Sequence, residues 1–326
     1  MIIRVHKESP LFEIVFLGTS ASAPSIHRGL SAQVVIHNEH RFLVDCGEGT
    51  QRQILKSGIG FKRLNHILIT HGHLDHILGL AGLMSTVMRW EAMEELEILG
   101  GKWAMERIRD LVQGVVLRGK ASPIPLTFTD IQPGPVFEHR DFSVTAFPVY
   151  HRGPDCLGYI FEEYARRPFL PEKADALQIP SGPWRRDLVE GKAVTLPDGR
   201  SIQPEDVLGD ARAGTKLILT GDVGRTDELR HICRDADALI IESTYLDEEN
   251  EMAQTYAHMT ARKAATLARE TGVKNLILTH LSRRYRERDV LDEARAIFPN
   301  TIVARDFDHF QIKRGDLTKI EPGQSA

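Results

Sequence analysis

The stretch Thr70-His71-Gly72-His73-Leu74-Asp75-His76 joins an apolar run to a cluster of metal-ligand side chains. The run before it, Ile67–Thr70, predicts a buried strand, and α/β proteins place their chemistry in the loops at the carboxyl ends of such strands. Three imidazoles and one carboxylate within six positions match the ligands that Zn²⁺ prefers. The stretch therefore predicts a metal site, and the alternative is a histidine-rich turn that binds no metal.

The spacing within this stretch indicates two ions. His71 and His73 are two residues apart, so both imidazoles can reach the same ion. Asp75 and His76 lie where the chain is expected to turn into a helix beginning near Ile77. We expect these two side chains to face a second ion.

Four further ligand-type residues stand at the ends of other predicted strands. These residues are His151, Asp222, Glu242 and His280. The expected strands are Phe142–Val149, Lys216–Thr220, Ala238–Glu242 and Asn275–Thr279. Taken singly, Asp222 could cap a helix, either histidine could be a satisfied core residue, and Glu242 could be a surface acid.

Taken jointly, the ligand-type residues suffice for two zinc ions that share a carboxylate and a water. The set is His71, His73, Asp75, His76, His151, Asp222 and His280. Metal pairs about 3.5–4 Å apart clamp the attacking and leaving oxygens of a phosphodiester displacement. The shared water then loses a proton near neutral pH, because the cations stabilise hydroxide. Such a site supports hydrolysis without a serine or cysteine nucleophile.

Composition places the chain among ordinary globular proteins. Of its 326 residues, 42% are hydrophobic and 26% charged, and the net charge is −4, which gives no support for a nucleic-acid partner without a local basic patch. No apolar run reaches the roughly 20 residues of a membrane span, and we expect no secretory leader at the start. The lack of such a run predicts no membrane association. The three cysteines are widely spaced, odd in number and not in C-x-x-C form, which favours reduced thiols in the cytoplasm and argues against sulfur-ligated zinc.

Several strands from both halves of the chain end at a ligand-type residue, so we expect two sheets that converge on one edge. Regular order is interrupted between residues 164 and 200, where five prolines and two arginine pairs occur. This segment is expected to be an inserted excursion with short helical pieces over 172–177 and 185–190.

The ordered motifs His-x-His-x-Asp-His, a later histidine, Gly-Asp and a strand-end histidine resemble the metallo-β-lactamase superfamily. Within it, the chain resembles the ribonuclease Z family of tRNA 3′-processing endonucleases over residues 12 to about 310. The narrower likeness is carried by 17–19, 44–53, 220–222, 258–261, 280–285 and the arm segments 179–183, 196–200 and 204–209. The chain departs from the commoner pattern at Gly72 and Leu74, whose residue types are exchanged, and none of the departures removes a ligand.

The resemblance implies an α/β (α+β) fold, a four-layer αββα metallo-β-lactamase sandwich. It implies one domain over residues 1–326 with an inserted flexible arm at 164–200. One zinc ion would be held by His71, His73, His151 and Asp222, and the second by Asp75, His76, His280 and the shared Asp222.

The resemblance also implies roles in catalysis. Asp75 would orient or deprotonate the attacking water as well as bind metal. His258 would face the scissile phosphate and stabilise its charge or protonate the leaving oxygen, with Glu242 holding the tautomer of its ring. Asp45 is expected to accept a proton from a ligand imidazole.

Substrate contacts are expected in two places. The turn after His280 suits phosphate contacts, although a solvated helix start is the alternative, and the arm carries seven Lys/Arg against five acids, a net of +2. The expected substrate-binding residues are Arg283, Arg284, Arg185, Arg186, Gly182 and Pro183. Glycine and proline near the middle of the arm fit a segment with a loop at its tip that follows the phosphate backbone of folded RNA by shape. The resemblance implies a homodimer in which one subunit's arm serves the other's site.

The function expected from the resemblance is a zinc-dependent phosphodiesterase that removes 3′ trailers from precursor tRNA. It would cut after the discriminator nucleotide and leave a 3′-hydroxyl on the tRNA and a 5′-phosphate on the trailer. One alternative is another hydrolase of the superfamily, acting on a small ester, sulfate ester or cyclic phosphodiester. The other is a non-catalytic RNA-binding protein on the same fold. Mn²⁺ or Fe²⁺ could occupy the same ligands in place of two Zn²⁺.

Overall fold

Strand β1 (Phe12–Gly18) sends alternate side chains to its two faces, as the period of two along a strand requires. Ile14 and Phe16 pack in one buried apolar cluster, whereas Val15 and Leu17 pack in another. Strand β1 therefore separates two cores, one between the two sheets of the fold and one beneath the helices on its other face.

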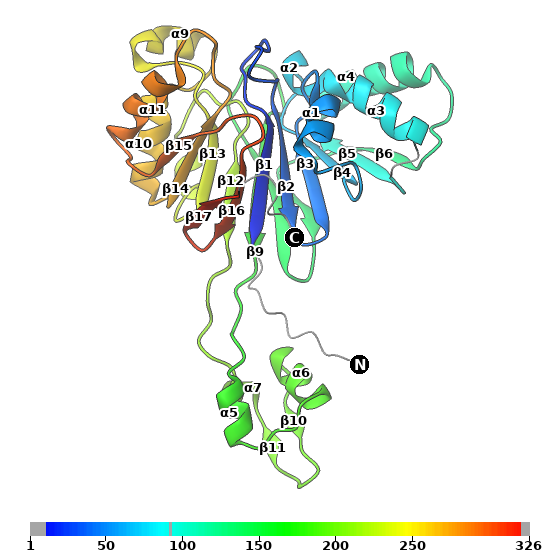
Figure 1. Cartoon of the computed structure of the whole chain (residues 1–326), viewed down its shortest axis with the longest axis vertical. Helices are drawn as coiled ribbons and strands as arrows, with labels where there is room; N and C mark the ends of the chain where they lie inside the picture. The colour runs from blue at the N-terminus through cyan, green and yellow to red at the C-terminus, as the bar shows by residue number, and fades with distance from the viewer. Residues whose placement is uncertain (1–10, 91–92, 321–326) are drawn as a thin grey trace. The chain divides into compact units, whose positions relative to one another are not determined.

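The computed structural model describes residues 11–90 and 93–320 (Figure 1). Within them, one sheet has eight strands and a second has seven. The first sheet runs in the order β17 (Asp316–Lys319), β16 (His309–Lys313), β1, β2 (Ala32–His37), β3 (His40–Val44), β4 (His66–Ile69), β5 (Leu96–Gly100), β6 (Leu126–Asp130). The second runs in the order β15 (Thr301–Val303), β14 (Asn275–Thr279), β13 (Ala238–Glu242), β12 (Lys216–Leu219), β9 (Leu157–Glu163), β8 (Phe142–Pro148), β7 (Gly134–Glu138).

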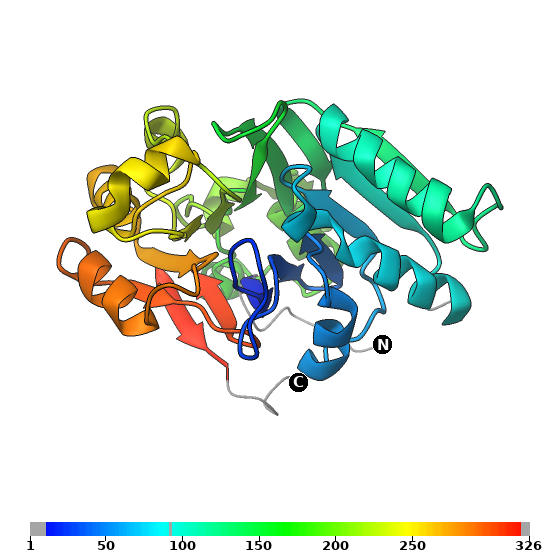
Figure 2. The ribbon, with the colours of Figure 1, turned by 90° about the horizontal axis from the view of Figure 1, so that it is seen from above.

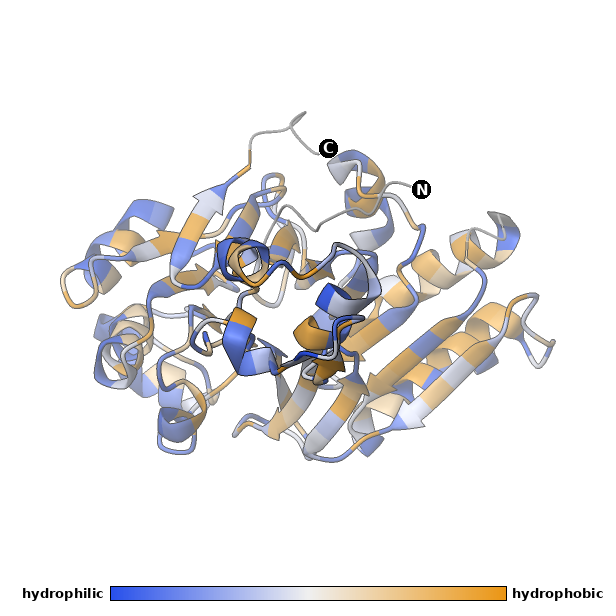
Figure 3. Ribbon diagram, turned by 90° about the horizontal axis from the view of Figure 1, so that it is seen from below, coloured by the Kyte–Doolittle hydropathy of each residue, from blue (hydrophilic) through white to orange (hydrophobic). Residues whose placement is uncertain are grey.

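Helices cover the outer face of each sheet, so the layers are helix, sheet, sheet and helix (Figure 2). The first sheet is covered by α1 (Thr50–Ser57), α3 (Gly79–Trp90) and α4 (Lys102–Arg109), and the second by α8 (Leu229–Ile232), α10 (Ala261–Thr271) and α11 (Glu287–Arg295). Figure 3 shows hydrophobic residues along the strands of both sheets. The expected four-layer αββα sandwich is confirmed. Among the described residues, no helix combines the length and apolar character that a membrane crossing requires.

Parallel pairing brings the carboxyl ends of several strands to one edge. In the first sheet β3 pairs in parallel with β4, and in the second β13 pairs in parallel with both β12 and β14. The loops after β4, β12 and β14 carry His71, Asp222 and His280, and His151 follows β8 of the second sheet. The expectation that two sheets converge on one edge is therefore confirmed.

The chain after β4 differs from the sequence-based expectation. A separate short helix, α2 (Leu74–Ile77), contains Asp75 and His76, where a single helix beginning near Ile77 was expected. Helix α3 starts again at Gly79, where an added Cβ would lie 2.0 Å from the Gly47 carbonyl oxygen. Only glycine permits this close approach, and it lets the chain change direction between the two helices.

Other elements were not expected at all. Strands β6, β7 and β17 have mostly partly buried or exposed side chains, so their apolar alternation is weak in the sequence. Helix α4 ends at Arg109, and the chain continues from it as a π-helix, Asp110–Leu117. Edge strands and π-helical turns are set by their neighbours and leave little periodic signal.

Residues Glu163–Gly214 form a second compact unit, called here the arm unit; the rest is the body unit. The arm unit contains α5 (Pro171–Ala176), α6 (Pro183–Val189), β10 (Val194–Thr195), β11 (Ser201–Ile202) and α7 (Pro204–Val207). It has its own apolar core, which includes the buried residues Ala174, Leu188 and Val207. It begins one residue before the expected arm and continues beyond its expected end at residue 200.

The wider boundary changes the charge of the arm. Residues 163–214 contain eight Lys/Arg and nine Asp/Glu, a net of −1, where the narrower boundary gave +2. Several of its cations are also engaged with acids inside the unit: Arg167 with Glu205, Arg185 with Asp175, Lys192 with Glu190 and Arg200 with Asp198. Residues 164–200 keep their net of +2, but the whole arm unit is not positively charged, because residues 201–214 add three acids and one base and Glu163 adds a further acid.

The separate core of the arm unit generates a prediction. Leu188→Ala should unfold this unit alone, because Leu188 is fully buried and its cluster contains only arm residues. A buried Leu→Ala change costs about 2–5 kcal/mol, a large loss for a core this small. Hydrogen exchange of the full-length protein should show lost protection within 163–214 and unchanged protection in β1 and β14. The control is Val189→Ala, whose side chain is 52% exposed; loss of protection in β14 would contradict the prediction.

Candidate metal centre

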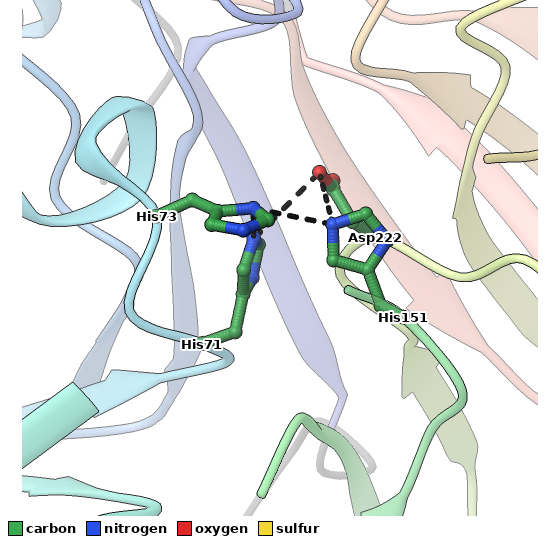
Figure 4. Close-up of side chains that lie close together, drawn as sticks. All are labelled: His71, His73, His151 and Asp222. Carbon is green, nitrogen blue, oxygen red and sulfur yellow. Dashed lines mark hydrogen bonds and ion pairs between the residues drawn. The ribbon is translucent and has the colours of Figure 1, made fainter. Parts of the chain in front are cut away.

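Four side chains from three loops meet in the first cluster (Figure 4). His73 Nδ1 lies 2.9 Å from His71 Nε2 and 3.2 Å from His151 Nε2. Asp222 Oδ2 lies 3.8 Å from His71 Nε2 and 3.7 Å from His151 Nε2. Three imidazole nitrogens and a carboxylate oxygen therefore converge on one point.

A second cluster adjoins the first through Asp222. Asp75, His76 and His280 offer ligand atoms that lie within 4.8 Å of one another. Asp222 Oδ2 lies 3.4 Å from His76 Nε2, and its Oδ1 lies 3.4 Å from His280 Nε2. The carboxylate of Asp222 thus borders both clusters. Its Oδ2 faces His71 and His151 of the first cluster and His76 of the second, and its Oδ1 faces His280.

The polar atoms of the second cluster fit a cation. His76 Nε2 and His280 Nε2 are buried and have no hydrogen-bond partner, although buried polar atoms are nearly always satisfied. Ligands about 2.0–2.1 Å from a tetrahedral ion stand roughly 3.3 Å apart, close to the separations found here. A divalent cation would satisfy both nitrogens, so the residues present fit a bound metal.

The second nitrogen of most of these rings is held by a neighbouring group. Asp45 Oδ2 lies 2.7 Å from His76 Nδ1, and the Ala257 carbonyl oxygen lies 2.7 Å from His151 Nδ1. The hydroxyls of Thr70 and Thr244 each lie 3.0 Å from Nδ1 of His71 and His280, respectively. Such partners fix the tautomer and the orientation of a metal-binding imidazole.

In the first cluster, the electrostatics favour the protonation states that a metal requires. Burial lowers the pKa of His71 and His151, and it lowers the pKa of His73 to about 4. Burial opposes ionisation of Asp222, but His280 and His76 outweigh it and hold the pKa of that carboxyl well below its ordinary value. Neutral imidazoles and ionised carboxylates are the forms that bind metal ions.

His76 and Asp75 are neighbours in the second cluster, with His76 Nε2 3.8 Å from Asp75 Oδ2. Burial disfavours charge on His76, but the carboxylates of Asp222, Asp45 and Asp75 outweigh it and raise the pKa of His76 well above its ordinary value. Burial likewise opposes ionisation of Asp75, and His76 and His280 lower its pKa in spite of it. Excess negative charge surrounds His76, and a cation would neutralise it.

His258 and Glu242 stand beside these clusters. His258 Nδ1 lies 2.8 Å from Glu242 Oε1 and 3.9 Å from Asp222 Oδ2. Burial would lower the pKa of His258, but the Glu242 carboxylate outweighs it and raises that pKa to about 9. The doubly protonated, positively charged form of the His258 ring is therefore favoured at neutral pH. Glu242 also accepts from the Val223 N–H at 2.9 Å, so its own position is fixed.

Backbone conformation at the strand ends is unusual where the clusters form. Asp45 and His280 have φ of 61° and 55°, in the left-handed region that non-glycine residues seldom adopt. Gly221, at φ 62°, directly precedes Asp222, and an added Cβ there would lie 2.8 Å from the Thr70 Cβ. Such conformations persist only where the surrounding contacts impose them, and they often mark functional sites.

The expected substrate-binding residues differ in exposure and in whether they already have a partner within the protein. Arg283 is exposed, whereas Arg284 lies 3.0 Å from Glu249 and is already engaged. In the arm unit, Arg185 donates to the Ile179 carbonyl and Arg186 is exposed. Gly182 lies in the turn before helix α6, at φ 119°, and Pro183 is the first residue of that helix.

Sequence reasoning missed three groups that touch the clusters. The Ser22 N–H donates to Asp75 Oδ2 at 2.9 Å, and Ser22 itself has a φ of 57°. The Thr244 hydroxyl contacts both Glu242 and His280, and the Thr70 hydroxyl contacts both Asp45 and His71. A threonine directly before the histidine motif was visible in the sequence as a signal, but a backbone donor 53 residues away was not.

Comparison with known proteins shows similarity over almost the whole chain. The chain is 44% identical over 302 residues to "Ribonuclease Z" of Bradyrhizobium diazoefficiens, covering 93% of this chain and 100% of that protein. It is 39% identical over 306 residues to "Ribonuclease Z" of Archaeoglobus fulgidus, covering 93% and 98%. Two family models match parts of the chain: "Anti-Pycsar protein Apyc1" over residues 12–163 and "Beta-lactamase superfamily domain" over 188–281.

Solved structures share the fold. The crystal structure of human tRNase Z, short form, superposes with a TM-score of 0.61 at 26% identity, covering 91% of this chain and 98% of that chain. The metallo-β-lactamase fold protein YhfI from Bacillus subtilis superposes with a TM-score of 0.65 at 17% identity, covering 93% of this chain and 100% of that chain.

The contact between Asp45 and His76 generates a prediction. Asp45→Asn should weaken metal binding about 10–100-fold, because an amide nitrogen facing His76 Nδ1 would disfavour the tautomer that leaves Nε2 free. Asparagine tolerates the positive φ of this position, so circular dichroism should show an unchanged fold. Competition for Zn²⁺ with a chromophoric chelator measures the affinity. The control is Asp235→Asn, an exposed aspartate with a φ of 55°; equal affinities for both variants would contradict the prediction.

Proposed function

The chain belongs to the ribonuclease Z family, and from that membership we propose that it removes 3′ trailers from precursor tRNA. Cleavage after the discriminator nucleotide would leave a 3′-hydroxyl on the tRNA and a 5′-phosphate on the trailer. The observation that carries the proposal is the 44% identity over 93% of the chain. The cluster of histidines and aspartates able to bind metal supports it.

The proposed cofactor is a pair of zinc ions. His71, His73, His151 and Asp222 would hold one ion, and Asp75, His76, His280 and the shared Asp222 the other. The cysteines Cys46, Cys156 and Cys233 are buried and belong to none of the candidate clusters among the described residues. An imidazole and carboxylate donor set suits Zn²⁺ and also admits Mn²⁺ or Fe²⁺.

Bound divalent ions supply Lewis-acid stabilisation of phosphate charge and lower the pKa of water. The protein's own part is to position the reacting groups. Asp75 would orient the attacking water and take its proton, with its carboxylate held by the Ser22 N–H. Water oxygen would attack phosphorus as the bond to the 3′-oxygen of the discriminator ribose breaks.

His258 would complete the reaction by giving its proton to the departing 3′-oxygen. Its raised pKa of about 9 keeps the proton available at neutral pH, and Glu242 orients the ring. Positioned general acids contribute typically 10²–10⁴-fold to the rate. The product then carries the 3′-hydroxyl that the proposed specificity requires.

Contacts to the tRNA would come from two regions. We assign phosphate contacts to Arg283, which is exposed, and RNA contacts to the arm unit. Because the arm unit carries a net charge of −1, its contribution would rest on shape and main-chain contacts more than on charge. We also propose a homodimer, as the family likeness implies, and a cytoplasmic location, which the free cysteines fit.

Asp75→Ala tests the catalytic assignment. Cleavage of a 3′-extended precursor tRNA should fall at least about 10³-fold, because the variant loses both a ligand and the group proposed to receive the water proton. Metal analysis of Zn²⁺-reconstituted protein should show bound zinc falling from two ions per chain toward one. The control His231→Ala removes an exposed histidine outside the cluster. Full activity of Asp75→Ala would remove Asp75 from the mechanism, and intact precursor with zinc-loaded wild type would overturn the proposed function.

Excision of the arm unit tests its role in substrate binding. Arg166 and Arg212 form an antiparallel backbone pair. The Arg166 nitrogen lies 2.9 Å from the Arg212 carbonyl oxygen, and the Arg212 nitrogen lies 2.8 Å from the Arg166 carbonyl oxygen. Residues 167–211 can therefore be replaced by an Asn-Gly turn that closes a two-residue hairpin. The loss in kcat/KM should be at least 100-fold larger for precursor tRNA than for the small diester bis(p-nitrophenyl) phosphate. Equal losses on both substrates would show that the arm does not contact the RNA.

A further inference from the structure

Two exposed tyrosines flank the metal centre, and each has an arginine against its ring. Arg225 Cζ lies 3.9 Å from the centroid of the Tyr150 ring, and Arg152 Cζ lies 5.3 Å from the centroid of the Tyr256 ring. Tyr150 is 47% exposed and Tyr256 42% exposed, so part of each side chain is open to solvent. We call these four residues the tyrosine–arginine rim.

The rim is fixed to the site by its loops. Tyr150 and Arg152 are the two neighbours of His151, Arg225 lies three residues after Asp222, and Tyr256 lies two residues before His258. The Gly224 N–H donates to the Tyr150 carbonyl at 2.7 Å. The Ala257 carbonyl, next to Tyr256, lies 2.7 Å from His151 Nδ1. The two pairs therefore border the first cluster from three loops, which one main-chain hydrogen bond and the contact of the His151 ring with a carbonyl hold together.

The charges of the rim are not neutralised within the protein. Over residues 11–90 and 93–320, neither Arg152 nor Arg225 forms an ion pair or a side-chain hydrogen bond. Six other exposed arginines of the body unit have acidic partners, whereas some, such as Arg283, form no ion pair among the described residues; the six are Arg140, Arg230, Arg262, Arg286, Arg288 and Arg305. In a chain with more acids than bases, two unpaired arginines beside the metal centre leave their donors available to an anion.

The chemistry of the rim matches one class of ligand. Unpaired nucleobases stack on aromatic faces and on guanidinium planes, and guanidinium N–H groups bind phosphate oxygens. Resting on the proposed function, we propose that the tyrosine–arginine rim binds the unpaired nucleotides that flank the scissile phosphodiester. Each ring would offer its open face to a base, and each arginine would contact a phosphate. The alternative is that the pairs only stabilise the loops, which predicts the same loss of activity whether or not the RNA carries the flanking bases.

The test is a cycle that pairs protein variants with altered RNA. Tyr150→Ala and Tyr256→Ala are each assayed with precursor tRNA that is intact or that carries an abasic nucleotide on either side of the cleavage position. With intact RNA, at least one variant should lower kcat/KM about tenfold, the usual scale for a lost base stack. For the wild type, kcat/KM should fall by a similar factor when the intact RNA is replaced by the abasic RNA. For that variant, the same replacement should lower kcat/KM little further, because the stacking contact is already lost.

A structural role gives another pattern, since distortion of the site would lower cleavage of intact and abasic RNA by the same factor in every variant. That result on both sides of the cleavage position overturns the inference. Tyr150→Phe and Tyr256→Phe keep the stacking face and should restore the cost of the abasic nucleotide.

The arginines are tested by salt. Arg152→Ala and Arg225→Ala should each flatten the fall of log kcat/KM with log salt by about 0.7, the contribution of one phosphate contact in single strands. Arg288→Ala removes the same charge from α11 and serves as the control. Unchanged slopes for both rim variants would overturn the phosphate contacts. Intact precursor with zinc-loaded wild type would instead refute the proposed function.

Discussion

One buried carboxylate connects the parts of this site. Asp222 is 3% exposed, and its two oxygens lie 3.4–3.9 Å from nitrogens of five histidines: His71, His76, His151, His258 and His280. An ionised carboxylate in such a position is costly unless cations or hydrogen bonds compensate it. The surrounding imidazoles provide that compensation here, and metal ions would provide more. Every assigned role in the centre is therefore coupled to the charge of this one group.

The two-sheet architecture is what makes this concentration of polar groups possible. Apolar layers on both faces of each sheet fix the strand ends, and the loops beyond them carry the polar groups. The left-handed conformations of Asp45 and His280 occur at such ends, where neighbouring hydrogen bonds impose them. The apolar layers thus stabilise the fold, and the reactive side chains lie at the shared edge of the two sheets, where the tyrosine–arginine rim also lies.

Much of the site could be predicted because its signals are local. A histidine that directly follows an apolar run is visible in the sequence, and the parallel strands of an α/β sheet bring such residues to one edge. The predictions that failed concern features without local signals. The arm boundary and its net charge depend on which distant segment pairs with Arg166, and the helix containing Asp75 and His76 depends on packing of Gly79 against Gly47.

The sequence alone determined the ligand types, their order and the strands that precede them, because periodicity and side-chain chemistry are properties of short segments. Only the tertiary structure decided which atoms meet. It set the backbone donor of Ser22 against Asp75, Glu242 against His258, and two unpaired arginines against exposed tyrosines. These contacts join residues from different loops, and their distances follow from how two sheets pack, which no short stretch of sequence encodes.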